Sequence, residues 1–404
     1  MVAPKLRFKE FDGDWSESKL KDCIDSIDSG WSPQCESYPA DENEWAVLKT
    51  TSVDWDGFKA NFNKKLPSNL EARFEIEVKP NDILVTRAGP TERVGVVAVV
   101  PHNVRSKLMI SDKLIRLKAN NENNPEFLGI SLSSVKCQNQ LQSKTSGLAK
   151  SQTNISQKIL CDVSLMTPAK AEQTKIASFL SNVDEKISQL TQKHQLLSQY
   201  KQGMMQKLFS QQIRFKAGDG SEFGEWEEKE LKEVAEINPK AKKLPANFIY
   251  IDLESVEKGQ LLLQKNIELQ DAPSRAQRLL AKGDVLFQMV RPYQQNNYYF
   301  NLSGEYVAST GYAQIRTKLD SKFIYYALHE KTFLDEVMNR CTGTSYPAIN
   351  SSDLSSIEIF VPCLEEQTKI ANFLSAIDQK IEVVAQQIEQ AKTWKKGLLQ
   401  QMFV

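Results

Sequence analysis

Apolar residues recur at alternating intervals of three and four in two long stretches of the chain, a spacing that predicts coiled-coil helices. Pro168 precedes the first stretch and Pro362 the second, and proline is well tolerated in the first turn of a helix. Gly203 and Gly397 lie at matching places near the two ends, where we expect each helix to bend or fray. The apolar seam includes Ile176, Leu180, Val183, Ile187 and Leu190 in the first helix, and Ile370, Leu374, Ile377, Ile381 and Val384 in the second.

The rest of the chain carries short β-like runs separated by turns, with a few shorter helical segments. Strands are expected at 46–48, 82–86, 94–98 and 114–117, and again at 248–251, 284–287 and 312–315, with helices near 125–142 and 321–339. This pattern predicts an α+β fold with two modules of mixed structure and twisted sheets, at 1–167 and 212–361. The long helices fill 168–211 and 362–404, and we expect them to run antiparallel in a pseudo-two-fold arrangement if the ends of the second module lie close together.

An internal repeat organises the chain. Residues 172–177 and 366–371 both read Glu-Gln-Thr-Lys-Ile-Ala, and the similarity continues along both helices. A fainter repeat precedes each module, where Trp15 and Trp226 stand in similar short motifs. Between these landmarks the two modules share only fragments of sequence. Because surfaces that face the same partner stay alike, the contrast suggests one kind of partner for the helices and two different ligands for the modules.

Aromatic residues beside the seam also occur at matched positions. The set comprises Phe179, Tyr200 and Phe209 in the first helix and Phe373, Trp394 and Phe403 in the second. These rings widen the apolar face beyond what a two-stranded coil needs, so they predict a stripe on which partner helices dock. The alternative is that they pack against their own modules.

Composition restricts the class of function. A chain of 404 residues suits two or three domains, and its 51 basic and 51 acidic side chains cancel, so net charge is uninformative about a polyanionic partner. The six cysteines form no CxxC pair, and the three histidines are scattered. Without a phosphate loop, a nucleophile elbow or an adenine-methylation motif, we expect no catalysis, metal or cofactor in this chain. The lack of a signal sequence and of a membrane-length apolar stretch predicts a soluble, cytoplasmic protein.

Loops that follow matched strands carry contrasting side chains in the two modules. Arginine fits guanine in the major groove, whereas glutamine and asparagine fit adenine, so these loops could read different bases. Later loops rich in glycine, small hydroxyls and basic groups suit phosphate and groove contacts, although such loops are often only connectors. The candidates are Gly30, Trp31, Ser32, Arg87, Gly89, Thr91, Arg93, Lys144, Thr145, Ser146 and Lys150 in the first module, and Gln288, Arg291, Tyr293, Gln294, Gln295, Asn296, Asn297, Thr342, Thr344, Ser345 and Tyr346 in the second.

The pattern Pro-x-x-x-Glu-Gln-x-x-Ile-Ala at 168–177 and 362–371, with the tryptophan motifs and two unlike modules, resembles the specificity subunit of type I restriction–modification systems. The resemblance covers the whole chain. It implies that the modules are target-recognition domains, that each reads one half of an asymmetric, gapped site in double-stranded DNA, and that the helices set the gap. It also implies two modification subunits that bind S-adenosylmethionine and methylate adenine, and restriction subunits that use ATP and Mg²⁺.

The sequence leaves two other classes of function open. One is a coiled-coil scaffold whose modules bind proteins, and the other is a stand-alone regulator that binds DNA without enzymes. A protein-binding scaffold would show no salt-dependent DNA binding. A specificity subunit and a stand-alone regulator would both show it.

Overall fold

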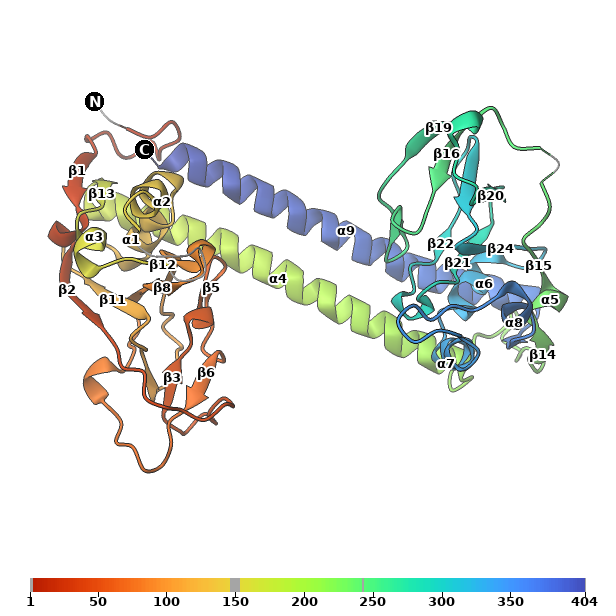
Figure 1. The fold of residues 1–404 in the computed structure, drawn as a ribbon, viewed down its shortest axis with the longest axis horizontal. Helices are drawn as coiled ribbons and strands as arrows, with labels where there is room; N and C mark the ends of the chain where they lie inside the picture. The colour runs from red at the N-terminus through yellow and green to blue at the C-terminus, as the bar shows by residue number, and fades with distance from the viewer. Residues whose placement is uncertain (1–2, 146–152, 242, 404) are drawn as a thin grey trace. The chain divides into compact units, whose positions relative to one another are not determined.

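The structure, a computed structural model, describes residues 3–145, 153–241 and 243–403. Contacts divide the chain into two compact units. Unit 1 comprises residues 1–189 and 387–404, and unit 2 comprises residues 190–386. The long helices α4 (Lys170–Phe209) and α9 (Leu364–Met402) both contribute to each unit (Figure 1). The expected α+β fold is confirmed.

Unit 1 is built around a four-stranded antiparallel sheet in the order β2-β11-β7-β9 and a three-stranded sheet in the order β10-β3-β6. The four-stranded sheet contains β2 (Ile24–Ser29), β11 (Leu114–Ala119), β7 (Ile83–Thr86) and β9 (Val97–Val99). The three-stranded sheet contains β10 (Leu108–Met109), β3 (Ala46–Leu48) and β6 (Asn63–Lys65). Smaller pairs join β1 (Ser16–Lys19) with β13 (Ser164–Thr167), β4 (Val53–Asp54) with β5 (Gly57–Phe58), and β8 (Ala88–Gly89) with β12 (Thr153–Asn154).

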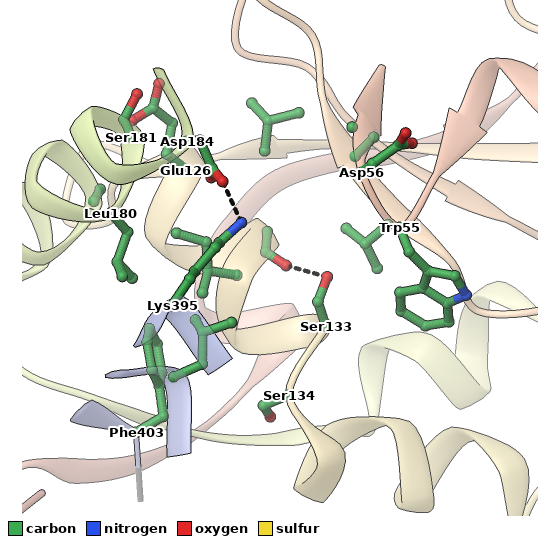
Figure 2. A pocket seen from close by; sticks show the side chains of 18 of the residues that line it. Trp55, Asp56, Glu126, Ser133, Ser134, Leu180, Ser181, Asp184, Lys395 and Phe403 are labelled. Atoms are coloured by element: carbon green, nitrogen blue, oxygen red, sulfur yellow. Dashed lines mark hydrogen bonds and ion pairs between the residues drawn. The ribbon is translucent and has the colours of Figure 1, made fainter. Parts of the chain in front are cut away.

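Among its described residues, unit 1 also has three short α-helices: α1 (Pro125–Leu132), α2 (Val135–Gln142) and α3 (Gln157–Cys161). The side chain of Asn124 caps α1 by accepting from the backbone N–H of Phe127, and Pro125 suits the first turn. Gly129 lets α1 approach β9 closely, because a Cβ at this position would lie 2.5 Å from Cγ2 of Val99. A cavity of about 570 Å³ lies between α1, the β4–β5 hairpin and the parts of α4 and α9 that belong to unit 1 (Figure 2).

Unit 2 repeats this plan with different details. One antiparallel sheet has the order β15-β24-β21-β22, and a second sheet has the order β19-β16-β23-β20. Its strands are β14 (Glu227–Glu230), β15 (Ala235–Ile237), β16 (Asn247–Ile251), β17 (Val256–Glu257), β18 (Gln260–Leu261), β19 (Lys265–Glu268), β20 (Ala276–Leu279), β21 (Val285–Gln288), β22 (Tyr298–Tyr299), β23 (Tyr306–Ser309), β24 (Tyr312–Thr317) and β25 (Glu358–Val361). Its short helices are α5 (Leu231–Val234), α6 (Ser321–Ala327), α7 (Lys331–Asn339) and α8 (Ser351–Ser355).

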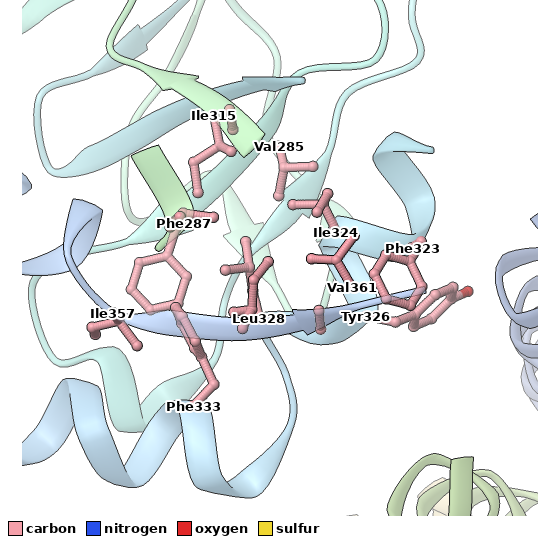
Figure 3. Packing of buried hydrophobic residues seen from close by; sticks show 14 of the residues in the cluster. Val285, Phe287, Ile315, Phe323, Ile324, Tyr326, Leu328, Phe333, Ile357 and Val361 are labelled. Carbon is pink, nitrogen blue, oxygen red and sulfur yellow. The ribbon is translucent and has the colours of Figure 1, made fainter. Parts of the chain in front are cut away.

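The main core of unit 2 lies between the β21–β24 sheet and helices α6 to α8 (Figure 3). Phe287 and Phe333 meet edge to face with ring centroids 5.9 Å apart, and Phe323 and Tyr326 project from α6. Asp320 caps α6 by accepting from two backbone N–H groups, as Asn124 caps α1. The two capping residues therefore mark equivalent helices in the two units.

The long helices run antiparallel within each unit. In unit 1, Asp184 of α4 pairs with Lys395 near the end of α9 at 2.5 Å. In unit 2, Lys201 near the end of α4 pairs with Asp378 of α9 at 2.6 Å. All ten seam positions named from the sequence are buried or half-buried. The expected fraying at Gly203 and Gly397 is wrong, because α4 continues to Phe209 and α9 to Met402, where buried Leu208 and Met402 anchor the ends in the two cores.

The repeated Glu-Gln pair at the start of each helix holds its own unit together. In unit 1, Glu172 accepts from the guanidinium of Arg7 at 2.7 Å and from the indole N–H of Trp15 at 3.3 Å. Gln173 donates to the carbonyl of Pro168 and accepts from the backbone N–H of Asn124, both at 2.9 Å.

The same four contacts recur in unit 2. Glu366 accepts from Arg214 and Trp226, and Gln367 joins the carbonyl of Pro362 to the backbone N–H of Asp320. The sequence identity of the two helix starts thus has a cause inside each unit, and it no longer requires a shared partner.

Candidate nucleic-acid interface

In unit 2, the loop after β21 is held in shape by the amide of Gln288. This amide donates to the carbonyl of Val290 at 2.8 Å and to the side chain of Gln294 at 2.9 Å, and it accepts from the backbone N–H of Asn296 at 3.0 Å. Arg291 and Gln295 both adopt left-handed backbone conformations, with φ of 54° and 51°. The result is a tight loop that presents Tyr293 and Gln294 to solvent.

The second candidate loop of unit 2 lies beside the first. The backbone N–H of Arg291 donates to the carbonyl of Pro347 at 2.7 Å, and a β-bridge joins Val290 to Ala348. The Arg291 guanidinium lies 4.2 Å from the ring centroid of Tyr346, a cation–π contact that holds both side chains at the surface. Thr342, Thr344 and Ser345 are also exposed.

In unit 1 the loop after β7 pairs with the segment that follows the second candidate loop. β8, which contains Gly89, pairs with β12 just before α3, and the backbone carbonyl of Arg87 accepts from Ile155 at 3.0 Å. The side chain of Arg87 is exposed. Lys144 is also exposed and Thr145 half-buried, whereas the predicted Ser146 and Lys150 lie outside the described residues.

The segment from Gly30 to Ser32 packs against residues 110–112, which connect β10 to β11. The backbone N–H of Trp31 donates to the carbonyl of Ile110 at 3.1 Å, and Ser32 bonds to Asp112. The Arg73 guanidinium stacks 4.1 Å from the ring centroid of Trp31. Sequence reasoning missed Arg73, because nothing local links it to Trp31.

Some predicted base-contacting side chains are engaged inside the units, which gives them a positioning role. Gln288 and Asn297 are 2% and 1% exposed, so neither offers a surface to a base. Arg93 donates to Asp54 at 2.8 Å and to the carbonyl of Val53 at 2.7 Å. The hydrogen bond from Lys59, together with that from Arg93, lowers the pKa of Asp54 to about 2. Thr91 bonds to Thr153 at 2.7 Å, which ties the two loops of unit 1.

Several of the aromatic residues expected to dock partners pack within their own units. Phe209 contacts Phe323 in unit 2 with ring centroids 5.6 Å apart, and Phe403 stacks on Phe127 in unit 1 at 5.4 Å. Phe373 contacts Phe215 at 5.7 Å.

The remaining three rings differ in exposure. Phe179 lies between Phe8 and Trp394 in unit 1. Only Tyr200 and Trp394 of the six keep large exposed fractions, 51% and 53%, so these two carry the docking hypothesis furthest.

A sequence profile described as the type I restriction modification DNA specificity domain matches residues 13–199 and 224–393. The chain belongs to this family. The resemblance of the helix motifs to type I specificity subunits is therefore confirmed, and a DNA sequence-specificity role follows from membership, which favours neither the protein scaffold nor the stand-alone regulator.

Individual specificity subunits match over different lengths. The chain is 37% identical to the EcoEI specificity subunit of Escherichia coli over 187 residues, which are 46% of this chain and 31% of that protein. It is 26% identical to the MjaVIII specificity subunit of Methanocaldococcus jannaschii over 417 aligned positions, covering 97% of this chain and 94% of that one. The chain thus spans about a third of the first relative and nearly all of the second.

Two solved structures of type I systems share the fold. The S subunit of a type I system from M. genitalium aligns over 100% of this chain and 99% of its own, with a TM-score of 0.63 and 16% identity. A chain from a structure on complex assembly and conformational transition of the type I system aligns over 96% of this chain and 97% of its own, with a TM-score of 0.50 and 17% identity.

Neither a metal site nor a membrane span is found in the part of the chain that the structure describes. Its His, Cys, Asp and Glu side chains form no cluster of three or more able to hold a metal ion. Among the same residues, no helix combines the length and the apolar character needed to cross a bilayer.

Proposed function

We propose that each unit of this specificity subunit reads one half of a split, asymmetric DNA sequence. The observation that carries the proposal is that the two units share a fold but differ in the side chains of their surface loops. In both units the loop after the equivalent strand, β7 or β21, pairs with the segment that ends the second candidate loop. The side chains at the surface of these loops differ: Arg87 and Lys144 in unit 1, and Arg291, Tyr293, Gln294 and Tyr346 in unit 2.

The chemistry of these loops suits DNA. Arginine and glutamine can read base edges in the major groove, and the exposed hydroxyls of Thr342, Thr344 and Ser345 suit phosphate contacts. The buried amide of Gln288 and the ion-paired Arg93 hold the loops, so the surface residues approach DNA from a preformed arrangement.

The long helices would then set the gap between the half-sites and dock two modification subunits. Exposed Tyr200 and Trp394, at matched positions of α4 and α9, favour such docking. Catalysis would belong to the partners: methyl transfer from S-adenosylmethionine to the modification subunits, and ATP-dependent, Mg²⁺-dependent action to restriction subunits. As domain boundaries we propose 1–167 and 212–361 for the recognition domains, with helices at 168–211 and 362–404.

Purification of the full chain with its modification subunits, followed by a DNA footprint and sequencing of methylated adenines, tests the proposal. The expected result is a gapped, asymmetric footprint with one methylated adenine in each half and affinity that falls steeply with salt. A chain that binds only proteins, or a footprint without a gap, would contradict it.

A further inference from the structure

Equivalent helices in the two units differ in side-chain size at three positions that face the long helices or lie near them. The register follows from their caps, Asn124 and Asp320, and from Phe127 and Phe323, which contact Trp15 and Trp226 in the same way. With these residues matched, unit 1 has Gly129, Ile130 and Ser133 where unit 2 has Tyr325, Tyr326 and His329. Small and aliphatic groups in unit 1 thus replace three ring-bearing side chains.

In unit 2 these rings fill the space beside the long helices. The hydroxyl of Tyr326 donates to Oδ2 of Asp378 at 2.6 Å and lies 3.3 Å from the hydroxyl of Ser375. The ammonium group of Lys201 binds Oδ1 of the same Asp378 and lies 5.3 Å from the Tyr326 ring centroid.

Tyr325 reaches further, to the β17–β18 hairpin. Its hydroxyl would lie only 2.8 Å from a Cβ at Gly259, and its ring centroid lies 4.5 Å from that of His329. Unit 2 therefore closes the space between α6, the hairpin and the long helices with its own side chains.

In unit 1 the equivalent residues of the long helices border an open space. Asp184 pairs with Lys395 as Asp378 pairs with Lys201, and Ser181 stands where unit 2 has Ser375. The cavity of about 570 Å³ lies against these residues and extends to the β4–β5 hairpin (Figure 2). Polar groups that a tyrosine satisfies in unit 2 thus line a cavity in unit 1.

The rim of the cavity favours a protein occupant over a small molecule. Trp55 is 53% exposed and Val135 is 74% exposed, and both line the opening. Exposed apolar groups around a pocket with a few polar atoms are typical of a protein interface with an aromatic anchor.

We propose that the unit 1 cavity receives a tyrosine side chain from a modification subunit, in the role that Tyr326 plays within unit 2. The tyrosine hydroxyl donates to the Asp184 carboxylate, and the ring lies beside the ammonium group of Lys395. Asp184 already binds the ammonium group of Lys395, and the added hydroxyl gives its carboxylate the second donor that Asp378 receives from Tyr326 in unit 2. This inference rests on the proposed function and makes the two docking sites unequal.

Titration calorimetry of the full-length chain with the modification subunit from the same genome tests the proposal. Ile130→Tyr fills the cavity with the side chain that unit 2 carries, and we expect it to weaken one of two binding events by about tenfold or more. Ile130→Val, at the same position, leaves the cavity open and should bind like the unsubstituted chain. Equal binding by the Ile130→Tyr variant would overturn the inference.

A second arm uses the unsubstituted chain and does not depend on how a variant folds. p-Cresol, which is a tyrosine side chain without its backbone, is added at millimolar concentrations during the titration. Competition at one of the two sites supports the inference, whereas unaffected binding of the modification subunit overturns it. If the unsubstituted chain binds no modification subunit, the proposed function itself fails and this inference fails with it.

Discussion

Arg214 donates from Nε and Nη2 to the two carboxylate oxygens of Glu366, at 3.1 and 2.6 Å. The Glu366 side chain is 0% exposed and also accepts from the indole of Trp226. Glu366→Ala would leave the guanidinium and the indole N–H without their acceptor, so we expect unit 2 to lose about 3 kcal/mol of unfolding free energy. Urea unfolding monitored by tryptophan fluorescence measures the loss.

The neighbouring Glu365 provides a matched control. Glu365 forms an ion pair with Lys369, but its side chain is 58% exposed. Glu365→Ala should therefore change the unfolding free energy by less than about 1 kcal/mol. Equal effects of the two substitutions would contradict a structural role for the buried pair.

The stability of unit 2 should depend on pH through His329. Burial lowers the pKa of His329 to about 4 from 6.5, and the nearby Lys201 ammonium acts in the same direction. Because the folded-state pKa lies below the unfolded value, the stabilisation is complete above pH 6.5 and is lost as the pH falls toward 4. The loss is at most about 3 kcal/mol and is measured by thermal unfolding across this range.

Two controls isolate this effect. His329→Gln should remove the fall in stability between pH 6.5 and pH 4. His102→Gln, at an exposed histidine, should leave this fall unchanged. Asp54, with a pKa of about 2, affects stability only in a separate range below about pH 4. There its carboxylate becomes protonated and the ion pairs with Lys59 and Arg93 are lost. A slope unchanged in the His329 variant would exclude the histidine as its source.

Substitutions in the loops should affect one half of the DNA site at a time. Arg87→Ala should weaken discrimination only in the half read by unit 1, and Arg291→Ala only in the half read by unit 2. Loss of an arginine–base contact costs about 1–3 kcal/mol, which corresponds to a preference weaker by about fivefold to 150-fold. Sequencing of DNA selected by the assembled complex provides the measurement.

Lys331→Ala, which removes an exposed positive charge from unit 2 outside these loops, should leave both preferences intact. Gln294→Ala should act like Arg291→Ala, since both residues lie on the same loop. If either loop variant altered both halves or neither, the assignment of loops to half-sites would be wrong.

A fragment of residues 1–211 should form a symmetric dimer. Unit 1 buries Leu398 and Met402 of α9, and the fragment lacks both, but Met204 and Leu208 of α4 stand at the equivalent positions of the repeat. The end of α4 in one copy can therefore fill the gap in the other. Analytical sedimentation would detect the dimer. Together with modification subunits, the dimer should direct methylation of a symmetric site. A fragment that stays monomeric would contradict the proposed pairing of the helices through their apolar seam.

The fold was largely predictable from the chain because its signals are local. The spacing of apolar residues identified both long helices, and alternating or apolar runs identified β3, β7, β11, β16, β21 and β24. The continuation of α4 past Gly203 was not predictable, because the cost of one glycine, about 1 kcal/mol, is outweighed by packing of Leu208 and Phe209 against a distant core.

The candidate site was less predictable because its geometry depends on contacts between distant residues. No local pattern distinguishes Gln288, which holds its loop from inside, from Gln294, which is exposed six residues later. Arg93 is fixed by Asp54, and Trp31 by Arg73, through contacts that only the folded chain brings together. The repeated Glu-Gln pair showed the same limit, since its internal bonds to Trp15 and Trp226 were hidden in the sequence.

The division of the chain into units has a consequence for its synthesis. Unit 2 is one uninterrupted stretch, residues 190–386, and can complete its core as soon as it leaves the ribosome. Unit 1 must wait for Leu398, Met402 and Phe403, whose side chains pack on its core. At a synthesis rate of about 5–20 residues per second, the time between synthesis of residue 189 and of the last residues is roughly 10–40 s. The first-made part of the chain is thus the last to finish folding, and a chain truncated before residue 398 would spare unit 2 and leave unit 1 open.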